Sequence, residues 1–377
     1  MVGFNHLSYW EKDSFVGHPD YVVIGSGIVG LSTAIFLKER EPTKKVTVLE
    51  RGFLPTGAST KNAGFACIGS PGEILDDLKS MDESVVFATT LRRWLGLKEL
   101  EKLLGKDKIA YTHLLSYELF SDANSNTFDA CCDRLSDLNE KICEITGVSE
   151  ALVVDEKICK SGGFSGFSRA ISSRVEGQID TGKMMKSLLQ KAVECGVVLL
   201  NGIEVYNVDG KTLNTSQGSL SFEKLLVCTN GFSKRFFPEL DVEPARAQVL
   251  VTSEIPDLKF RGNFHYDRGY YYFRNVGKRV LFGGGRITDL KGENTTDMSI
   301  TSGIMNHLEQ MLETMILPGQ TFEIEHRWAG TMGVGAAKAP IIQQMGEDIF
   351  CAIRLGGMGV AMGTLVGKEL AELATKS

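Results

Sequence analysis

Three glycines, Gly25, Gly27 and Gly30, form the pattern GxGxxG inside the apolar stretch YVVIGSGIVGLSTAIFLKER. A β-branched run precedes the pattern and a helical spacing of apolar residues follows it, which is the context typical of dinucleotide binding. The first glycine permits a tight turn, the second lets a pyrophosphate approach the backbone, and the third lets the helix pack closely on the strand. The helix is expected from Ile28, so that its positive end faces the phosphates. The stretch therefore predicts a site for a dinucleotide.

Glu50 stands at the end of the next strand-like run, VTVL at residues 46–49. This place is close to the spacing at which a carboxylate accepts hydrogen bonds from a ribose, and a carboxylate there would repel the 2′-phosphate of NADP. FAD and NAD share the glycine pattern, so the glycines alone do not choose between them.

Two glycine-rich segments favour FAD. The loop GASTKNAG at residues 57–64 follows Glu50 closely, and its backbone N–H groups could line a cofactor that extends well beyond its pyrophosphate. The turn GGMGVAMG at residues 356–363 precedes a helix whose positive end suits the anion that a reduced flavin carries. The chain has one GxGxxG only, which indicates no separate NAD(P)H site and makes the organic substrate the expected source of electrons.

The elements that hold these residues alternate between strand and helix. Residues 21–24, a helix ended by Pro42 and residues 46–49 make one βαβ unit. A helix followed by a strand returns in TGKMMKSLLQKAVECGVVLLNGIEV at residues 181–205, and KLLVCTNG at residues 224–231 has the character of a buried strand. This alternation indicates a parallel sheet covered by helices.

Other segments have a different character. Charged amphipathic helices dominate residues 83–147, and alternating strands fill residues 245–325, the pattern of an antiparallel sheet. We predict an α/β fold in which a Rossmann-like FAD-binding domain is interrupted by a discontinuous α+β substrate domain on a mixed, largely antiparallel sheet. The predicted segments are 1–82, 172–243 and 325–377 for the FAD-binding domain, and 83–171 and 244–324 for the substrate domain.

The composition is that of an ordinary globular enzyme of 377 residues, with 43% hydrophobic residues, 23% charged residues and a net charge of −6. This balance lacks the basic surface of a nucleic-acid-binding protein, so nucleic acid is not an expected partner. The eight cysteines contain no CxxC pair, and no group of residues has the spacing of a metal site. Glu11, Lys12 and Asp13 break the apolar run that a signal peptide needs, and no stretch suits a membrane span. We expect a cytoplasmic protein with reduced thiols.

The order of these motifs resembles that of the D-amino-acid oxidase family of FAD-dependent oxidoreductases, which includes glycine oxidase, sarcosine oxidase and γ-glutamylputrescine oxidase. The likeness runs from about Tyr21 to Ala374 and is carried by VVIGSGIVGLSTA with Glu50, GASTKNAG, EGQIDTGKMMKSLLQKAVECGV, LLVCTNG, GYYYFR, LFGGG and GGMGVAMGTLVGKELAEL. It implies an FAD cofactor. It also implies oxidation of the C–N bond of a small amine or amino acid by hydride transfer to flavin N5, after which water hydrolyses the imine.

The resemblance also implies which residues touch the cofactor. The three glycines would meet the pyrophosphate, Glu50 the adenosine ribose, Val205 the adenine region, residues 59–64 the flavin side of the dinucleotide, and residues 357–363 the flavin pyrimidine. The implied cofactor-binding residues are Gly25, Gly27, Ile28, Gly30, Glu50, Arg51, Ser59, Thr60, Lys61, Asn62, Ala63, Gly64, Val205, Gly231, Gly357, Met358, Gly359 and Val360.

Tyr270 and Arg274 are the predicted catalytic residues. Tyr270 falls where the family often places an active-site tyrosine on a strand. A period of two puts Tyr270, Tyr272 and Arg274 on one face of that strand, so that aromatic surface and a cation lie together.

The chain departs from the family at Met332. Relatives that oxidise amino acids pair the substrate carboxylate with an arginine in a GxRPxT-like segment, where this chain reads WAGTMGVGAAKAP. A thioether cannot replace the bidentate fork of an arginine. Either Arg274, Arg286 or Arg354 does this work, or the substrate is not a simple α-amino acid.

The flavin attachment follows from a second departure. Sarcosine oxidase ties its flavin to a cysteine near this segment, whereas His326, Arg327 and Trp328 stand here without one, and GASTKNAG has no histidine. We predict non-covalent FAD.

Several alternatives stay open. One is an FAD-dependent 2-hydroxy-acid dehydrogenase on the same scaffold, and another is an oxidoreductase that modifies an aminomethyl group of a tRNA base. The electron acceptor is O2, a quinone or a protein, and the oligomeric state is not predicted. Among residues near the expected site, we expect His265 to have a hydrogen-bonded structural role and Cys67 to be a small buried hydrophobe.

Overall fold

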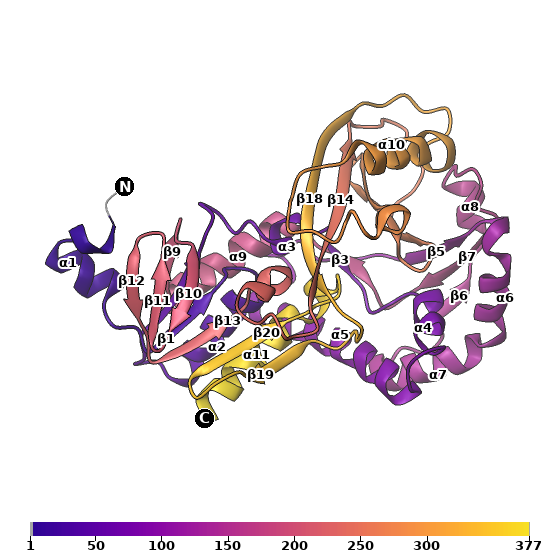
Figure 1. Cartoon of the computed structure of the whole chain (residues 1–377). Coiled ribbons are helices and arrows are strands. Elements are labelled where there is room, and N and C mark those ends of the chain that lie inside the picture. The colour runs from indigo at the N-terminus through magenta and orange to yellow at the C-terminus, as the bar shows by residue number, and fades with distance from the viewer. Residues whose placement is uncertain (1–2, 377) are drawn as a thin grey trace.

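The computed structural model describes residues 3–376 and contains two large sheets side by side, each with its own helices (Figure 1). The first sheet contains β1 (Tyr21–Ile24), β2 (Val46–Glu50), β9 (Val198–Asn201), β13 (Lys224–Val227), β19 (Ile341–Gln344) and β20 (Ile349–Ile353). These strands follow the order β19-β20-β13-β1-β2-β9. All neighbours pair in parallel except β19 and β20. The central β1 is buried along its whole length, which explains its run of apolar residues.

Long helices pack with this sheet around one apolar core. They are α2 (Ile28–Arg40), α5 (Glu83–Leu104), α9 (Thr181–Glu194) and α11 (Gly359–Lys376). Gly367 lets α11 lie close to α2, because a Cβ added there would come within 2.7 Å of the Ser32 Cβ. Segments from the two ends of the sequence therefore lie against each other, as Figure 1 shows.

The second sheet contains β5 (Ser116–Phe120), β6 (Leu152–Val154), β7 (Arg169–Ser173), β14 (Glu243–Thr252), β15 (Asn263–Tyr266), β16 (Tyr271–Val276), β17 (Arg279–Gly284) and β18 (Ile324–Val334). Its order is β18-β14-β17-β16-β15-β5-β7-β6, and β15 with β5 is its parallel pair. Stacked aromatic rings build its core, with the Phe264 and Phe273 centroids 4.7 Å apart. Helix α10 (Ser302–Met311) adds Ile304 and Leu308 to this core.

Shorter elements join and flank the two sheets. The strands β3 (Phe65–Ala66), β4 (Thr112–His113) and β8 (Gly177–Gln178) form one small sheet, and β10 (Val205–Asp209), β11 (Thr212–Thr215) and β12 (Gly218–Ser221) form another. The remaining α-helices of the described residues are α1 (Tyr9–Glu11), α3 (Ala58–Lys61), α4 (Pro71–Asp77), α6 (Ser125–Asp133), α7 (Leu135–Thr146) and α8 (Lys157–Ser161). Within residues 3–376, no helix has both the length and the apolar character needed to cross a membrane.

The division into two domains stays a prediction, but strand pairing moves its boundaries. The boundary at residue 325 places β18 with the FAD-binding segments, whereas β18 pairs with β14 and belongs to the second sheet. The boundary at residue 172 cuts through β7, which belongs to the second sheet as well. In contrast, α5 buries Leu97 and Leu100 in the core of the first sheet. These pairings join distant segments, and a local change of composition does not record them.

Candidate active site

A cavity of about 620 Å³ takes its walls from both large sheets. The residues of the first sheet and its loops, together with residues 57–64, β10 and the start of α11, form what we call the cofactor wall. The residues of the second sheet and its loops, together with α4 and Lys338, form the substrate wall. The predicted site residues line this cavity, with the exception of Gly30, Thr60, Gly231 and Arg274.

The cofactor wall begins with the glycines that follow β1. Gly25 has a φ of +101°, which favours glycine, and its N–H donates to the Leu49 carbonyl at 2.8 Å. Gly27 directly precedes α2, and the Ile28 N–H donates to the Ser59 Oγ at 2.9 Å. Because these residues line the cavity, the positive amino end of α2 borders it, an arrangement that binds phosphate groups.

Glu50 ends β2 with a buried carboxylate that neighbouring groups hold in place. Its Oε2 accepts hydrogen bonds from the Ser26 N–H and hydroxyl at 3.2 and 2.9 Å, and its Oε1 accepts from the Gly52 N–H at 3.0 Å. The other contact of Oε1, from the Thr56 hydroxyl, is long at 3.4 Å. A carboxylate oxygen accepts about two hydrogen bonds, so Oε1 can take a hydroxyl from the cavity in place of that weak contact. This geometry fits a ribose.

Residues 57–64 and the start of α11 supply further backbone to the cofactor wall. Asn62 fixes the loop, because its Oδ1 accepts from the Gly64 N–H at 2.9 Å and from the Thr181 hydroxyl at 2.8 Å. Gly357 has a φ of +83° just before α11, and the first amides of a helix have no carbonyl partner inside it. Both segments can therefore hold the carbonyl and ring nitrogen atoms of a flavin.

Val205 is the first residue of β10 and lines the cavity together with Ile203 and Phe232. The Arg51 guanidinium lies over the Phe232 ring, 4.1 Å from its centroid. Apolar side chains and a flat cation are surfaces on which an adenine ring packs.

The substrate wall holds polar atoms that the protein leaves without partners. Within residues 3–376, His265 Nε2, Arg286 Nε and Thr331 Oγ1 are buried and have no hydrogen-bond partner. All three residues line the cavity. Because a buried polar group without a partner is costly, three of them on one wall indicate a polar ligand.

Burial also controls the protonation of this wall. It lowers the pKa of His265 to about 4 and raises the pKa of Tyr272 to about 12. Both rings pack edge-on against Phe65, with centroid distances of 5.1 and 5.7 Å. Tyr270 lines the cavity as the sequence predicts. His265 and Tyr272 are therefore neutral near pH 7.

The acidic residues of α4 pair with neighbouring cations. The Lys338 Nζ lies 3.0 Å from Glu73 and 2.7 Å from Asp77. Burial alone would raise the pKa of Glu73, but the charges of Arg93 and Lys338 overcome burial and lower the pKa to about 2. Glu73 is therefore ionised, and its charge is already compensated.

Comparison with known proteins identifies the family of the chain that forms this cavity. Residues 20–373 match the family described as FAD dependent oxidoreductase (DAO). The chain belongs to this family. The chain is an enzyme with FAD as its cofactor, and the predicted family and fold class are confirmed.

Relatives of this FAD-dependent oxidoreductase cover most of its length. The gamma-glutamylputrescine oxidoreductase of Escherichia coli (strain K12) is 22% identical, with 94% of this chain and 83% of that protein covered. The sarcosine oxidase subunit beta of Rhizobium meliloti (strain 1021) is 20% identical, with 91% and 81% covered. The structure of glycine oxidase from Geobacillus kaustophilus matches with a TM-score of 0.74 at 18% identity, over 96% of this chain and 95% of that one, which shows a shared fold.

Three predicted cofactor residues of the oxidoreductase do not line its cavity. A Cβ added at Gly30 would lie 1.9 Å from the Gly25 carbonyl oxygen, and one added at Gly231 would lie 2.3 Å from the Met332 carbonyl oxygen. Both glycines therefore permit close packing behind the wall. The Thr60 hydroxyl donates to a carbonyl of its own loop at 2.7 Å, and its side chain is exposed.

Arg274 is the main correction to the predicted catalytic residues. Its guanidinium donates to the Ala63 carbonyl, to Gln178 Oε1 at 2.7 Å and to the Ile179 carbonyl at 3.1 Å. Each of its three nitrogen atoms thus bonds to the protein and joins β16 to Ala63 and residues 178–179, and the side chain does not line the cavity. Arg354 is occupied in the same way, by a carboxylate and two carbonyls.

His265 and Thr331 are cavity residues whose role sequence reasoning missed. The sequence favoured a structural role for His265 and did not single out Thr331. A signal for His265 was present, because the short connection DRG predicts a hairpin, and in that hairpin His265 pairs with Tyr272. Thr331 lies on β18 beside Met332, which lines the cavity too.

Proposed function

We propose that the enzyme oxidises the C–N bond of a small amine or amino acid. One observation carries the proposal: backbone that fits FAD lines the same cavity as residues whose polar atoms are buried and have no partner within residues 3–376. Two relatives named for the amines gamma-glutamylputrescine and sarcosine support this substrate class.

The residues of the two walls would divide the work. When bound, FAD supplies the acceptor of the hydride. The glycines after β1 and the amino end of α2 would hold its phosphates, while residues 57–64 and the start of α11 would hold its flavin. The substrate wall would orient the C–N bond and exclude water, because His265, Tyr270 and Tyr272 line the cavity.

The burial that keeps His265 neutral also affects the protonation of the substrate. The desolvation that lowers the pKa of His265 to about 4 also disfavours an ammonium group in the cavity. The substrate would therefore react as the neutral amine, from which a hydride leaves more readily than from an ammonium. His265 Nε2 is unpartnered within residues 3–376 and would hydrogen-bond to this amine.

The FAD would be bound without a covalent link. Cys67 and Cys228 line the cavity, and burial raises the pKa of both thiols above its ordinary value. The thiolate is the reactive form of cysteine, so neither residue is activated. Acid precipitation tests this point: FAD should pass into the supernatant, and a yellow pellet contradicts the proposal.

An anaerobic titration of the FAD-loaded enzyme tests the reaction. Amines, D- and L-amino acids, N-methyl amino acids and 2-hydroxy acids are added separately, and the flavin absorbance is recorded. Bleaching by an amine or amino acid, with a carbonyl product after hydrolysis, is the expected result. Bleaching by 2-hydroxy acids alone contradicts the proposal and supports the hydroxy-acid dehydrogenase. Admitting O2 or a quinone afterwards identifies the electron acceptor.

A further inference from the structure

Arg286 stands out among the cations of the substrate wall. Arg268 lies 3.1 Å from Asp267 and 3.7 Å from Asp76, and Lys338 is paired with the acidic residues of α4. Arg286 lines the same cavity, but within residues 3–376 its side chain has no carboxylate partner and no hydrogen bond, and its Nε is buried. The substrate wall thus contains one arginine whose charge the described part of the chain does not compensate.

An arginine cannot remove this imbalance by losing its proton. Its guanidinium stays charged in proteins and offers five N–H donors in a flat fork that matches a carboxylate. A partly buried charge without a partner is unfavourable. A ligand that brings an anion to the cavity would compensate this charge.

The backbone around Arg286 brings it next to the predicted tyrosine. Gly284 and Gly285 have φ values of +121° and +76°, and a Cβ added at Gly284 would lie 2.1 Å from the Tyr270 carbonyl oxygen. The Gly285 N–H donates to that carbonyl at 3.1 Å. Two glycines therefore turn the chain sharply at the end of β17 and place Arg286 directly after the residue bonded to Tyr270.

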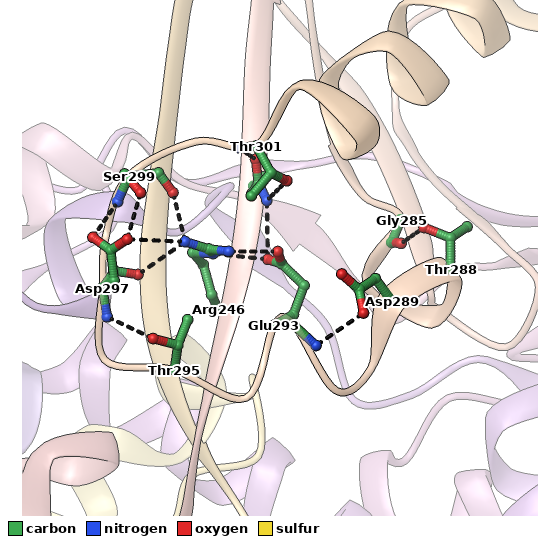
Figure 2. Close-up of polar contacts among 11 residues, drawn as sticks. Arg246, Gly285, Thr288, Asp289, Glu293, Thr295, Asp297, Ser299 and Thr301 are labelled. Carbon is green, nitrogen blue, oxygen red and sulfur yellow. Dashed lines mark hydrogen bonds and ion pairs between the residues drawn. The ribbon is translucent and has the colours of Figure 1, made fainter.

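A buried ion pair fastens the segment that follows Arg286. The Arg246 guanidinium on β14 donates to both Glu293 oxygens at 3.0 and 2.7 Å, and both side chains are almost completely buried. The same guanidinium donates to the Ser299 carbonyl at 3.0 Å, and the Arg246 N–H donates to the Glu293 carbonyl at 2.8 Å. Figure 2 shows the segment wrapped around Arg246, with Gly285 and Thr288 at its beginning. This strap, residues 286–301, therefore has a fixed path over β14.

We infer that Arg286 binds a carboxylate of the substrate, and that the strap positions it. The inference rests on the proposed oxidation of an amine and narrows the substrate class to amines that also carry a carboxylate. Arg286 comes from the strap of the second sheet, whereas Met332 on β18 offers that wall only a thioether. The substrate would lie with its amine toward His265 and its carboxylate toward Arg286.

The experiment uses the FAD-loaded enzyme and pairs of substrates that differ by one carboxylate. The variants are Arg286→Met and Arg286→Lys. Arg327→Met is the control, since Arg327 is an exposed arginine on β18 of the same sheet and pairs with Glu309 of α10. In Arg286→Met, kcat/KM for the amino acid should fall on the order of 100-fold, because one partner of a charge pair is lost. For the decarboxylated amine, kcat/KM should change less than about 3-fold. Arg286→Lys should keep part of the preference, and Arg327→Met all of it.

A binding measurement keeps the inference separate from the proposed reaction. Propionate, which has a carboxylate and no amine, is titrated into each FAD-loaded variant, and the perturbation of the flavin absorbance gives its Kd. Weaker binding by roughly 10-fold or more in Arg286→Met supports the inference even if no amine is oxidised. Unchanged propionate binding in Arg286→Met, or equal losses for the amino acid and its amine, overturns it. A loss seen with Lys61→Met instead would assign the carboxylate to Lys61, which lines the cavity and also has no ion pair within residues 3–376.

Discussion

The two walls of the cavity are built from different materials. The cofactor wall relies on backbone: glycines with positive φ, helix starts and one fixed carboxylate, Glu50. The substrate wall relies on side chains from several strands, such as His265 on β15, Tyr272 on β16 and Thr331 on β18. Backbone amides bind a phosphate or a flavin whatever the neighbouring residue types are. Side chains can be exchanged singly, so a family can keep one cofactor and change its substrate at the other wall.

If the walls are separate in this sense, damage to the strap should harm substrate binding and leave FAD binding intact. Arg246→Met leaves the Glu293 carboxylate buried and unpaired, and we expect the free energy of unfolding to fall by about 3–5 kcal/mol. KM for the substrate should rise, while the Kd of FAD should change less than about 3-fold. Urea unfolding and FAD titration measure the two effects.

The double variant Arg246→Met/Glu293→Gln is the control for the strap, because it removes the unpaired charge and should recover most of the lost stability. A drop in FAD affinity as large as the rise in KM would show that the walls are coupled and would contradict their separate roles.

The reverse test acts on the cofactor wall. In Gly30→Ala the new Cβ would lie 1.9 Å from the Gly25 carbonyl oxygen, so strand and helix must separate. We expect a loss of about 2–3 kcal/mol of stability and protein that purifies with little flavin. Gly303→Ala is the matched control, because nothing lies within 4 Å of its added Cβ. Normal flavin content in Gly30→Ala would contradict a backbone-built cofactor site.

The carboxylates behind the substrate wall predict an effect of pH on stability. Burial raises the pKa of Glu118 from 4.5 to about 7, and its Oε2 accepts from the Gly72 N–H at 2.7 Å. Between those pH values the folded protein keeps a proton that the unfolded chain has lost, so stability falls as pH rises from 4.5 to about 7. Glu118→Gln should not show this loss. Its free energy of unfolding relative to that of wild type should therefore increase by about 1–3 kcal/mol from pH 5 to pH 8.

Urea unfolding at the two pH values measures this gain. Glu150→Gln, at an exposed position, is the control and should show no such difference. A Glu118→Gln variant whose stability relative to wild type is the same at pH 5 and pH 8 would refute the raised pKa.

The smallest expected effect concerns the pH dependence of catalysis. Because the pKa of His265 is lowered to about 4, its titration should leave no inflection near pH 6.5 in a plot of kcat/KM against pH. The rate should instead rise toward the pKa of the substrate amine, and His265→Asn should keep the shape of the profile at a lower level. An inflection near pH 6.5 that disappears in His265→Asn would show that this histidine ionises during the reaction.

The different materials also explain which parts of the site could be predicted from the sequence. Gly25, Gly27 and Glu50 belong to one short βαβ unit, so their spacing alone indicates their position. Arg274 was misassigned because its acceptors include Gln178, a residue distant in the chain.

Gly231 was predicted to contact the cofactor but does not line the cavity, for a related reason. Its close neighbour Met332 lies on a strand of the other sheet. The cavity positions of Arg286 and Thr331 depend on how eight strands pair, including one parallel pair among antiparallel neighbours. A single sequence does not contain that order in any local pattern.

The packing of α11 on α2 has a consequence for how the enzyme is made. The cofactor wall needs Gly27 near one end of the chain and Gly357–Val360 near the other. A chain still being synthesised therefore carries its phosphate cradle long before the residues next to α11 are made. Complete FAD binding requires residues 357–360 to have left the ribosome, and a chain that stops at residue 354 would keep β20 and lack this part of the cofactor wall.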